Sequence, residues 1–302
     1  MTDIVLLDGG MGQELIHRSN QPPSPLWSAK VLMDEPEIVT AVHRDYIDAG
    51  AKVLTLNTYS ATPERLERDA SADLFEPLQA KAITVAQAAI AERDADAAIT
   101  IAGCLPPLFG SYHPENAPAF DICLDTYRRV VAQQAGAVDL FLCETMSSIK
   151  EVKAAVQAAV ESGKPVWCGM SVMDEDGTRL RSGEALDKAA LAAKQAGAAA
   201  VLINCSWPEA VTQAMPVLAQ TGLPFGGFAN GFTRIDALGI GGTVDVLETR
   251  NDLGPDQYAD HVFDWISAGA TIVGGCCEVG PAHIEKLAQR LKQAGHKLTG
   301  GL

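Results

Sequence analysis

The sequence predicts one α/β domain over residues 1–302, a (β/α)8 barrel of the TIM type with its active site at the C-terminal ends of the strands. Two patterns predict this fold. Short apolar runs rich in Val, Ile and Leu alternate along the chain with long Ala-rich stretches, which is typical of parallel strands covered by helices on both faces. Six glycine turns, among them "DAGAKV" and "SAGATI", end a helix and open the next strand. The length fits one barrel, since such domains reach ~250 residues or more.

Eight strands and the connections between them follow from these patterns. The links from strand to helix are long at 11–35, 106–120 and 231–254, whereas the glycine turns from helix to strand are tight. Elaboration of one face is typical of the active-site face of a barrel. Helical stretches include 76–92, 149–161 and 256–267. The predicted strands are 4–10, 52–57, 99–105, 139–145, 165–172, 199–205, 224–230 and 271–277.

Composition and charge exclude several classes of partner. The formal charge of −15 disfavours nucleic acid, whose binding depends on basic patches, and is compatible with a cationic ligand. No apolar run reaches the ~18 residues of a membrane span, and the opening "MTDIVLLDGG" has no basic leader. An odd number of cysteines, seven, argues against a disulfide framework. We therefore expect a cytoplasmic protein with reduced thiols that acts on small molecules; its oligomeric state is not predicted.

Three cysteines at strand ends are the strongest candidates for function. Cys205 ends the sixth strand in "LINCSWPEA", and Cys276 and Cys277 end the eighth in "IVGGCCEVG". Three thiolates with one open position describe a zinc site that has room for a substrate. The competing interpretation is that they are small buried hydrophobic residues, the usual state of free cysteine. The full set of strand-end candidates is Asp8, Asn57, Cys104, Glu144, Ser171, Cys205, Asn230, Cys276 and Cys277.

The remaining cysteines are expected to be buried and without a chemical role. They are Cys104, Cys123, Cys143 and Cys168, of which Cys104 also ends a predicted strand. Aromatic residues near the strand ends could supply a ring face to a cationic ligand or pack in the core. These are Tyr59, Trp207, Phe228 and Phe232.

Motifs at the strand ends resemble those of the homocysteine S-methyltransferases. They are "DGGMG" at the first strand, "NTYSAT" at the second, "CETM" at the fourth, "NCSWPE" at the sixth and "GGCC" with "GPAHI" at the eighth. The resemblance spans nearly the whole chain in the family's order. It implies a (β/α)8 homocysteine-binding barrel that transfers a methyl group from an onium donor to homocysteine and so makes methionine.

The resemblance also implies roles for individual residues. Cys205, Cys276 and Cys277 would hold the zinc, with the homocysteine sulfur as an exchangeable fourth ligand. A coordinated thiol is deprotonated, whereas a free thiol with a pKa of ~8.5 is mostly protonated at neutral pH.

The amino acid head of homocysteine also needs partners. By the same resemblance Glu144 and Asp8 would take the substrate ammonium, and backbone N–H groups around Gly9 and Gly10 would take its carboxylate. Asn57 and Asn230 are candidates for substrate binding or for closing the rim of the barrel.

Departures from the family bear on the methyl donor. The segment "ANGFTRI" after the seventh strand differs from the members that use S-methylmethionine. Tyr59 is shifted relative to the tyrosine of betaine-using relatives, whose extra C-terminal helices are also missing before Leu302. We therefore expect a sulfonium donor such as S-methylmethionine rather than betaine. Glu278 adds a carboxylate beside the cysteine pair, and the sequence indicates no role for it.

Two other functions remain compatible with the residues. One is a barrel enzyme of another reaction type whose strand-end cysteines are structural, which predicts that no metal binds. The other is a non-catalytic zinc and thiol binder, or a homocysteine-activating partner of a separate methyl-carrier protein. It predicts zinc and homocysteine binding without turnover of small onium donors.

Overall fold

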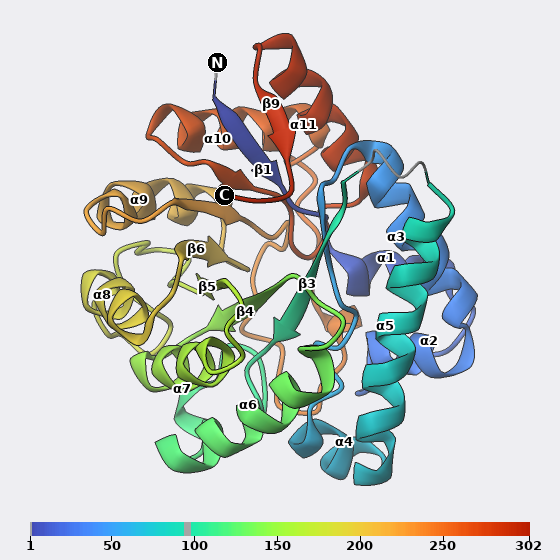
Figure 1. The fold of residues 1–302 in the computed structure, drawn as a ribbon. Helices are drawn as coiled ribbons and strands as arrows, with labels where there is room; N and C mark the ends of the chain where they lie inside the picture. Colours follow the sequence, from blue (N-terminus) through green and yellow to red (C-terminus); the bar gives the residue numbers. More distant parts are fainter. Residues whose placement is uncertain (1, 94–97) are drawn as a thin grey trace.

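Parallel strands form one curled sheet in the computed structural model, which describes residues 2–93 and 98–302. Across these described residues the strand order is β2-β3-β4-β5-β6-β7-β8-β1-β9, and neighbours pair in parallel. Figure 1 shows the sheet surrounded by helices, with β1 and β9 side by side. The strands are β1 (Asp3–Leu6), β2 (Val53–Thr55), β3 (Thr100–Leu105), β4 (Leu140–Met146), β5 (Val166–Met170), β6 (Ala200–Asn204), β7 (Phe225–Phe228), β8 (Ile272–Val273) and β9 (Lys297–Thr299).

β2, at one end of the strand order, is linked by backbone contacts to β1, which lies next to β9 at the other end. Leu7 forms a parallel bridge with Val53, and the Lys52 N–H donates to the Leu6 carbonyl at 2.8 Å. β9 pairs with the first residues of β1, from Asp3 to Val5. This ninth strand was not predicted, because three residues after the last helix carry no periodic apolar signal.

Helices alternate with the strands and lie on the outside of the curl (Figure 1). Several begin with proline at the first helical position, where the missing N–H costs nothing. The helices are α1 (Met11–Arg18), α2 (Ser28–Asp34), α3 (Pro36–Ala49), α4 (Pro63–Asp69), α5 (Phe75–Ala91), α6 (Phe120–Gln134), α7 (Ile149–Val160), α8 (Leu186–Ala196), α9 (Pro208–Ala219), α10 (Pro255–Ser267) and α11 (Pro281–Gln293), with short 3-10 turns η1 (Ala72–Leu74), η3 (Pro114–Asn116) and η4 (Val244–Val246).

The glycine turns that follow the helices mostly adopt the predicted left-handed conformation. Gly50, Gly163, Gly197, Gly222 and Gly269 all have positive φ, the region that glycine occupies without strain. The glycine of "QAGAVD", Gly136, does not have positive φ. Its turn after α6 therefore needs no left-handed residue at that position.

The apolar side chains form separate layers on the two faces of the sheet. One large cluster joins the outer face to the helices and includes the buried side chains of Ile4 and Ile203. A second cluster, built from the alternate strand positions, fills the inside of the curl and includes Val5, Leu142 and Trp167. The continuous apolar runs of the strands are explained by this burial on both faces.

Strand β7, with the sequence Phe-Gly-Gly-Phe, separates β6 from β8. A Cβ on Gly226 would lie 1.7 Å from the Ile272 carbonyl oxygen of β8, and one on Gly227 would lie 2.6 Å from the Val211 Cγ1 atom of α9. Neither position has room for a side chain. The two glycines therefore allow β7 to pack closely against β8 and α9.

The structure differs from the sequence-based prediction mainly at the connections. The link predicted at 11–35 contains two helices, α1 and α2, and Leu15 of α1 is fully buried. The other observed strands are shorter than predicted, but β4 keeps the predicted length and is displaced by one residue. The chain leaves the sheet after Leu6, Phe228 and Val273. Those departures turn the following residues toward the pocket described below. Among the described helices, none combines the length and the apolarity needed to span a bilayer.

Candidate metal centre and substrate pocket

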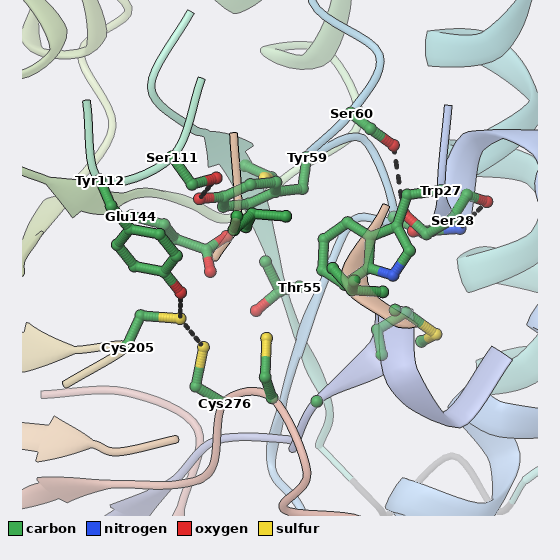
Figure 2. Close-up of a pocket in the computed structure, with 18 of the residues that line it drawn as sticks. Trp27, Ser28, Thr55, Tyr59, Ser60, Ser111, Tyr112, Glu144, Cys205 and Cys276 are labelled. Carbon is green, nitrogen blue, oxygen red and sulfur yellow. Dashed lines mark hydrogen bonds between the residues drawn. The ribbon is translucent and has the colours of Figure 1, made fainter. Parts of the chain in front are cut away.

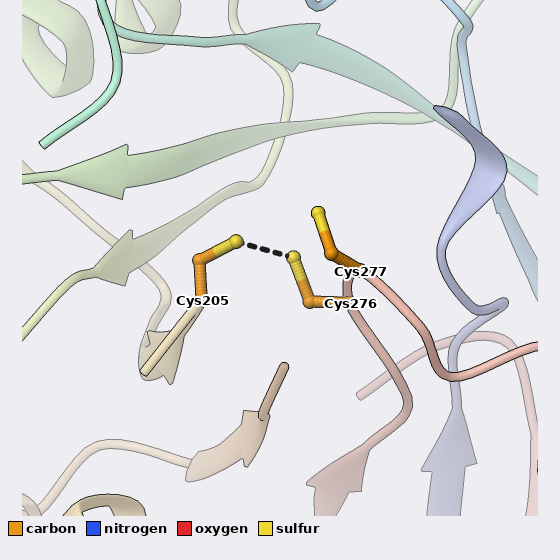
Figure 3. Close-up of side chains that lie close together, drawn as sticks. All are labelled: Cys205, Cys276 and Cys277. Atoms are coloured by element: carbon orange, nitrogen blue, oxygen red, sulfur yellow. Dashed lines mark hydrogen bonds between the residues drawn. The ribbon is translucent and has the colours of Figure 1, made fainter. Parts of the chain in front are cut away.

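Three cysteine sulfurs converge at the C-terminal ends of β6 and β8 (Figure 3). Cys205 directly follows β6, and Cys276 and Cys277 lie in the loop after β8. Their Sγ atoms all lie within 4.8 Å of one another, and the Cys205 and Cys276 Sγ atoms are 2.7 Å apart. The structure therefore brings together the three thiols that the sequence singled out.

Backbone hydrogen bonds fix the loop that carries the cysteine pair. The Gly275 N–H donates to the Asp8 carbonyl at 3.0 Å, and the Cys276 N–H donates to the Ala229 carbonyl at 2.9 Å. The Gly231 N–H donates to the Cys277 carbonyl, also at 2.9 Å. The loop is thus tied to the ends of both β1 and β7, which sets the direction of its two thiols.

Gly9 and Gly10, predicted to offer N–H groups to a substrate carboxylate, pack against the same loop. A Cβ on Gly9 would lie 2.1 Å from the Val279 carbonyl oxygen, and one on Gly10 would lie 2.4 Å from that of Cys276. The Gly10 N–H donates to the Val279 carbonyl at 2.9 Å, so it is not available to a substrate. Carboxylate binding stays a prediction for the backbone around Gly9.

The chemistry of the three thiols fits a thiophilic metal ion. Hydrogen bonds from Cys276 and Cys277 lower the pKa of Cys205, whereas the same contact with Cys205 raises the pKa of Cys276. One thiolate is therefore favoured and the next is opposed, so full ionisation of the three requires a cation. Thiolates on a tetrahedral zinc with bonds of ~2.3 Å lie about 3.8 Å apart. Side-chain rotations of Cys205 and Cys276 that separate their sulfurs by about 1 Å would meet that geometry.

The surroundings of Cys205 differ from those of the other two cysteines. The Tyr112 hydroxyl donates to the Cys205 Sγ atom at 3.1 Å, as Figure 2 shows. The Arg181 side chain donates to the Cys205 carbonyl at 3.1 Å, and its guanidinium carbon lies 5.0 Å from the centre of the Tyr112 ring. Cys205 itself has a φ of 51°, which is uncommon for a residue other than glycine.

Two carboxylates, Asp8 after β1 and Glu144 of β4, line the same pocket as the thiols. The Asp8 carboxylate accepts from the Thr55 N–H at 2.8 Å and from the Thr55 hydroxyl at 3.2 Å. Burial raises the pKa of Asp8 to about 7 and that of Glu144 to about 8, and the Asp8 charge further opposes ionisation of Glu144. Two acids held in this way favour a cationic ligand between them, since a cation would offset the cost of ionising both.

Glu144 is turned toward the pocket by an irregularity in β4. The pairing of β4 with β5 shifts register between Cys143 and Met146, and Thr145 has a φ of 60°. The Asn204 side chain accepts from the Thr145 N–H at 2.8 Å and donates to its hydroxyl at 3.0 Å. These bonds hold a backbone conformation that is rare for a residue other than glycine and that clusters at functional sites.

Aromatic rings line the pocket around the thiols. Trp27 and Tyr59 contact each other edge to face, with ring centres 5.9 Å apart (Figure 2). The Arg65 guanidinium carbon lies 5.2 Å from the centre of the Tyr59 ring, so one face of that ring already holds a cation. Phe232 also lines this pocket, together with the glycine-rich segment 239–242.

Comparisons with known proteins identify the family of this chain. The family model described as homocysteine S-methyltransferase matches residues 5–291. The chain belongs to the homocysteine S-methyltransferase family. A homocysteine S-methyltransferase from Escherichia coli strain K12 is 31% identical over 309 residues, which covers 95% of each chain. A selenocysteine Se-methyltransferase from Brassica oleracea var. italica is 26% identical over 314 residues, covering 95% of this chain and 88% of that one.

A solved structure supports the same relationship. The crystal structure of a homocysteine methyltransferase from Escherichia coli in its metallated form has a TM-score of 0.79 and 28% identity, with 96% of each chain covered. The family and the methyltransferase class predicted from the motifs are therefore confirmed. That relative was solved in a metallated form, and the three clustered thiols of this chain could hold a metal ion.

The other predicted site residues divide into those at the pocket and those away from it. Asn57 lines the pocket, and its side chain donates to the Ser28 carbonyl at 3.3 Å. Asn230 is fully buried outside the pocket lining, and its Oδ1 atom accepts from the Phe232 N–H. Cys104 is buried and lines the pocket, and burial together with the neighbouring Glu144 charge raises the pKa of its thiol. The buried cysteines Cys123, Cys143 and Cys168 are not among the lining residues.

Several residues of this methyltransferase site were not anticipated from the sequence. Tyr112 lies in the long irregular segment after β3, and Arg181 lies in the segment after β5. Trp27 precedes α2, in a link that was not expected to contain helices. No periodic pattern or motif marks these positions, because the loops that carry them meet only in the folded sheet. Glu278, left without a role, accepts from the Gln13 side chain at 2.6 Å, and Gln13 in turn accepts from the Trp27 indole.

Proposed function

We propose that this chain is a zinc-dependent methyltransferase that moves a methyl group from an onium donor to homocysteine and so forms methionine. The observation that carries the proposal is the convergence of three thiols at a pocket that is also lined by the buried carboxylate of Asp8 and the half-buried carboxylate of Glu144. Thiols supply the ligands that zinc prefers, and the carboxylates supply a site for an amino acid ammonium. Both are needed to bind homocysteine by its two ends.

Cys205, Cys276 and Cys277 are the residues that would hold the zinc. Bound there, zinc would keep the homocysteine thiol deprotonated and therefore nucleophilic at neutral pH. Zinc is proposed over harder cations because three thiolates suit a soft or borderline metal. The proton of the homocysteine thiol leaves to solvent as the substrate binds.

The chain's own residues would orient the amino acid head of homocysteine. Asp8 and Glu144 would bind the ammonium between them, and each must be ionised to do so. The backbone N–H groups at the start of α1, around Gly9 and Met11, would bind the carboxylate, since the N-terminus of a helix favours an anion. The head is then fixed at the pocket wall while the sulfur reaches the thiols.

Methyl transfer itself would be a direct displacement. The homocysteine sulfur attacks the methyl carbon of the donor, and a new carbon–sulfur bond forms as the bond from that carbon to the onium atom breaks. The bonding pair stays with the donor, which leaves as a neutral thioether or amine. No further redox partner or base is required. Positioning of the two reactants is the main contribution of the protein.

The aromatic residues would receive the positive charge of the donor. Trp27, Phe232 and Tyr59 line the same pocket as the thiols, and ring faces attract onium groups. A sulfonium donor such as S-methylmethionine is proposed over betaine. The departures of this sequence from betaine-using relatives near Tyr59 support that choice.

We also propose that the sheet is an eight-stranded TIM-type barrel in a single domain. The bridge between Leu7 and Val53 would close it, and β9 would be an addition beside β1 at the opposite end from the pocket. This topology explains why the candidate site lies where the strands β1, β4, β6 and β8 end.

A donor screen tests the proposed activity. Zinc-loaded protein is incubated with homocysteine and, in separate reactions, S-methylmethionine, betaine and dimethylsulfoniopropionate, and methionine is measured. We expect methionine with S-methylmethionine and none with the Cys276→Ser variant. Zinc and homocysteine binding without methionine from any donor would favour a partner that supplies the methyl group. Absence of both binding and turnover would contradict the proposal.

A further inference from the structure

The inference concerns what holds Cys205, and it rests on the proposed metal site. Within the described residues, Cys205 is the cysteine of the three whose sulfur accepts a hydrogen bond from an oxygen donor, the Tyr112 hydroxyl at 3.1 Å (Figure 2). We propose that Tyr112 remains hydrogen-bonded to the Cys205 thiolate when metal is bound, and that Arg181 is the positioning residue that holds the two together.

Arg181 joins the segments that carry the two residues. Its Nε atom donates to the Ser171 hydroxyl at 2.9 Å, and its two terminal nitrogens each bond to Asp174 at 3.1 Å. One of those nitrogens also donates to the Cys205 carbonyl at 3.1 Å. The Arg181 guanidinium also forms a cation–π contact with the Tyr112 ring, whose centre lies 5.0 Å from the guanidinium carbon. Only an arginine has a planar fork that can serve all of these partners at once.

The ion pair between Arg181 and Asp174 is shielded from solvent, with 10% and 7% of the two side chains exposed. Asp174 also accepts from the Trp207 N–H at 2.9 Å, two residues beyond Cys205. The turn that contains Cys205 is therefore held on one side by the arginine and on the other by the carboxylate. A buried and fully bonded pair of this kind fixes position more than it adds stability.

The backbone at both ends of the Tyr112–Cys205 bond adopts a conformation that needs such support. Tyr112 has a φ of 67° and Cys205 a φ of 51°, and neither is glycine. A residue other than glycine is strained in this left-handed conformation and keeps it only where surrounding contacts fix it. Arg181 contacts both residues, so it is placed to maintain the two conformations together.

The hydrogen bond has a chemical purpose at a thiolate-rich centre. Three cysteine thiolates and the homocysteine sulfur would together carry more negative charge than zinc neutralises. A hydroxyl that donates to Cys205 takes part of that charge and so lowers the repulsion among the sulfurs. The metal-bound state is favoured as a result. Loss of an outer partner of this kind typically lowers metal affinity ~10–100-fold.

The test uses Co²⁺ as a spectroscopic probe of the thiolate site. Co²⁺ is added to metal-stripped protein, and its affinity is measured by competition with a chelator of known strength. We expect Tyr112→Phe, which keeps the ring over Arg181 and removes only the hydroxyl, to bind Co²⁺ about 10-fold more weakly. The sulfur-to-cobalt charge-transfer band should also shift, because the charge on one sulfur changes.

Tyr59→Phe is the matched control. It makes the same chemical change in the same pocket, but the Tyr59 hydroxyl bonds to Ser111 at 2.9 Å and not to a sulfur. Its Co²⁺ affinity and spectrum should equal those of the unaltered protein. Arg181→Lys keeps the charge and loses the fork, so it should weaken Co²⁺ binding at least as much as Tyr112→Phe. The double variant should lose less than the product of the two single effects, since both act on Cys205.

The outcomes separate this inference from the metal site itself. If Tyr112→Phe and Tyr59→Phe both keep the affinity and the charge-transfer band of the unaltered protein, the inference is wrong. If Arg181→Lys lowers the melting temperature but leaves the Co²⁺ spectrum unchanged, Arg181 supports only the fold. If the unaltered protein binds no Co²⁺ at all, the proposed metal site fails and takes this inference with it.

Discussion

The carboxylate of Asp8, at the end of β1, accepts two hydrogen bonds from Thr55 at the end of β2, one from its N–H at 2.8 Å and one from its hydroxyl at 3.2 Å. Even with both bonds, burial raises the pKa of Asp8 from an ordinary 3.8 to about 7. Ionisation of the buried Asp8 carboxyl therefore costs the folded chain stability. Such a cost is typical of a position retained for binding rather than for stability.

We expect Asp8→Asn to change how stability depends on pH. Because the folded pKa is raised, the folded protein holds a proton that the unfolded chain loses, so the free energy of unfolding falls as pH rises from about 4 through about 7. The fall is at most about 4 kcal/mol. The asparagine variant lacks this dependence and should be the more stable protein at pH 8. The loss of one hydrogen bond reduces this gain in stability by about 1 kcal/mol. Denaturant unfolding of metal-free protein at pH 5 and pH 8 measures it; parallel pH profiles would contradict the assignment.

Glu144→Gln should weaken homocysteine binding without removing the metal. The glutamine keeps the size of the side chain but has no charge, so it cannot form an ion pair with an ammonium. A hydrogen bond to a charged group contributes ~1.5–3 kcal/mol. The affinity for homocysteine should therefore fall about 10- to 150-fold. Titration calorimetry on zinc-loaded protein gives the affinity, and metal analysis checks the zinc content. Glu76→Gln, on the exposed surface of α5, is the control. Loss of zinc in Glu144→Gln would instead assign the residue a structural role.

Proton release should distinguish the two ends of bound homocysteine. The amino acid 2-aminobutyrate has the same head without the thiol, and its binding requires an ionised Glu144, whose pKa is about 8. Its affinity should therefore rise from pH 6 to pH 8, with release of protons from the carboxyl groups. Homocysteine should release close to one proton more, because its thiol has a free pKa of ~8.5.

Calorimetry in two buffers of different ionisation enthalpy counts these protons. The additional proton should disappear when the metal is stripped, while release from the head remains. Methionine, which has no thiol proton, should resemble 2-aminobutyrate and bind far more weakly than homocysteine. Equal proton release by homocysteine with and without metal would exclude thiolate activation at this site.

Metal content should depend on the three converging cysteines and on no other. We expect about one zinc per chain, lost in Cys205→Ser and in Cys276→Ser, because a hydroxyl is a poor ligand for zinc. Cys123→Ser is the matched control, since its sulfur donates to the Pro118 carbonyl and a hydroxyl can do the same. Elemental analysis of the purified variants decides the point. Unchanged zinc in the first two variants would remove the assignment.

Gly10→Ala should disturb the metal centre from a distance along the chain. The added Cβ would lie 2.4 Å from the Cys276 carbonyl oxygen, so the loop with the cysteine pair must move. We expect weaker zinc binding and a loss of about 1–3 kcal/mol of stability from overpacking. Gly136→Ala, where nothing lies within 4 Å of the new Cβ, should leave both unchanged. Chelator competition and denaturant unfolding provide the two readouts, and normal zinc affinity in Gly10→Ala would refute this packing role.

The strand ends were accessible to sequence reasoning because a parallel sheet gives them a fixed meaning. Cys205, Cys276 and Glu144 follow apolar runs that can only be buried strands, so their place at one edge could be predicted. Tyr112 and Arg181 could not, because each lies in a long irregular segment and they meet through a cation–π contact between two loops. Gly10 shows a third case, where the motif was visible but its packing against the Cys276 carbonyl was not.

The two glycines of β7 have a consequence for the spacing of the thiols. β7 contributes no sulfur, yet it is the spacer whose width decides how far Cys205 on one side lies from Cys276 on the other. At Gly226 even a methyl group would clash with the Ile272 carbonyl and move the two flanking strands apart. The spacing of the three proposed metal ligands is thus set by two residues of β7 that have no side chain and supply no sulfur.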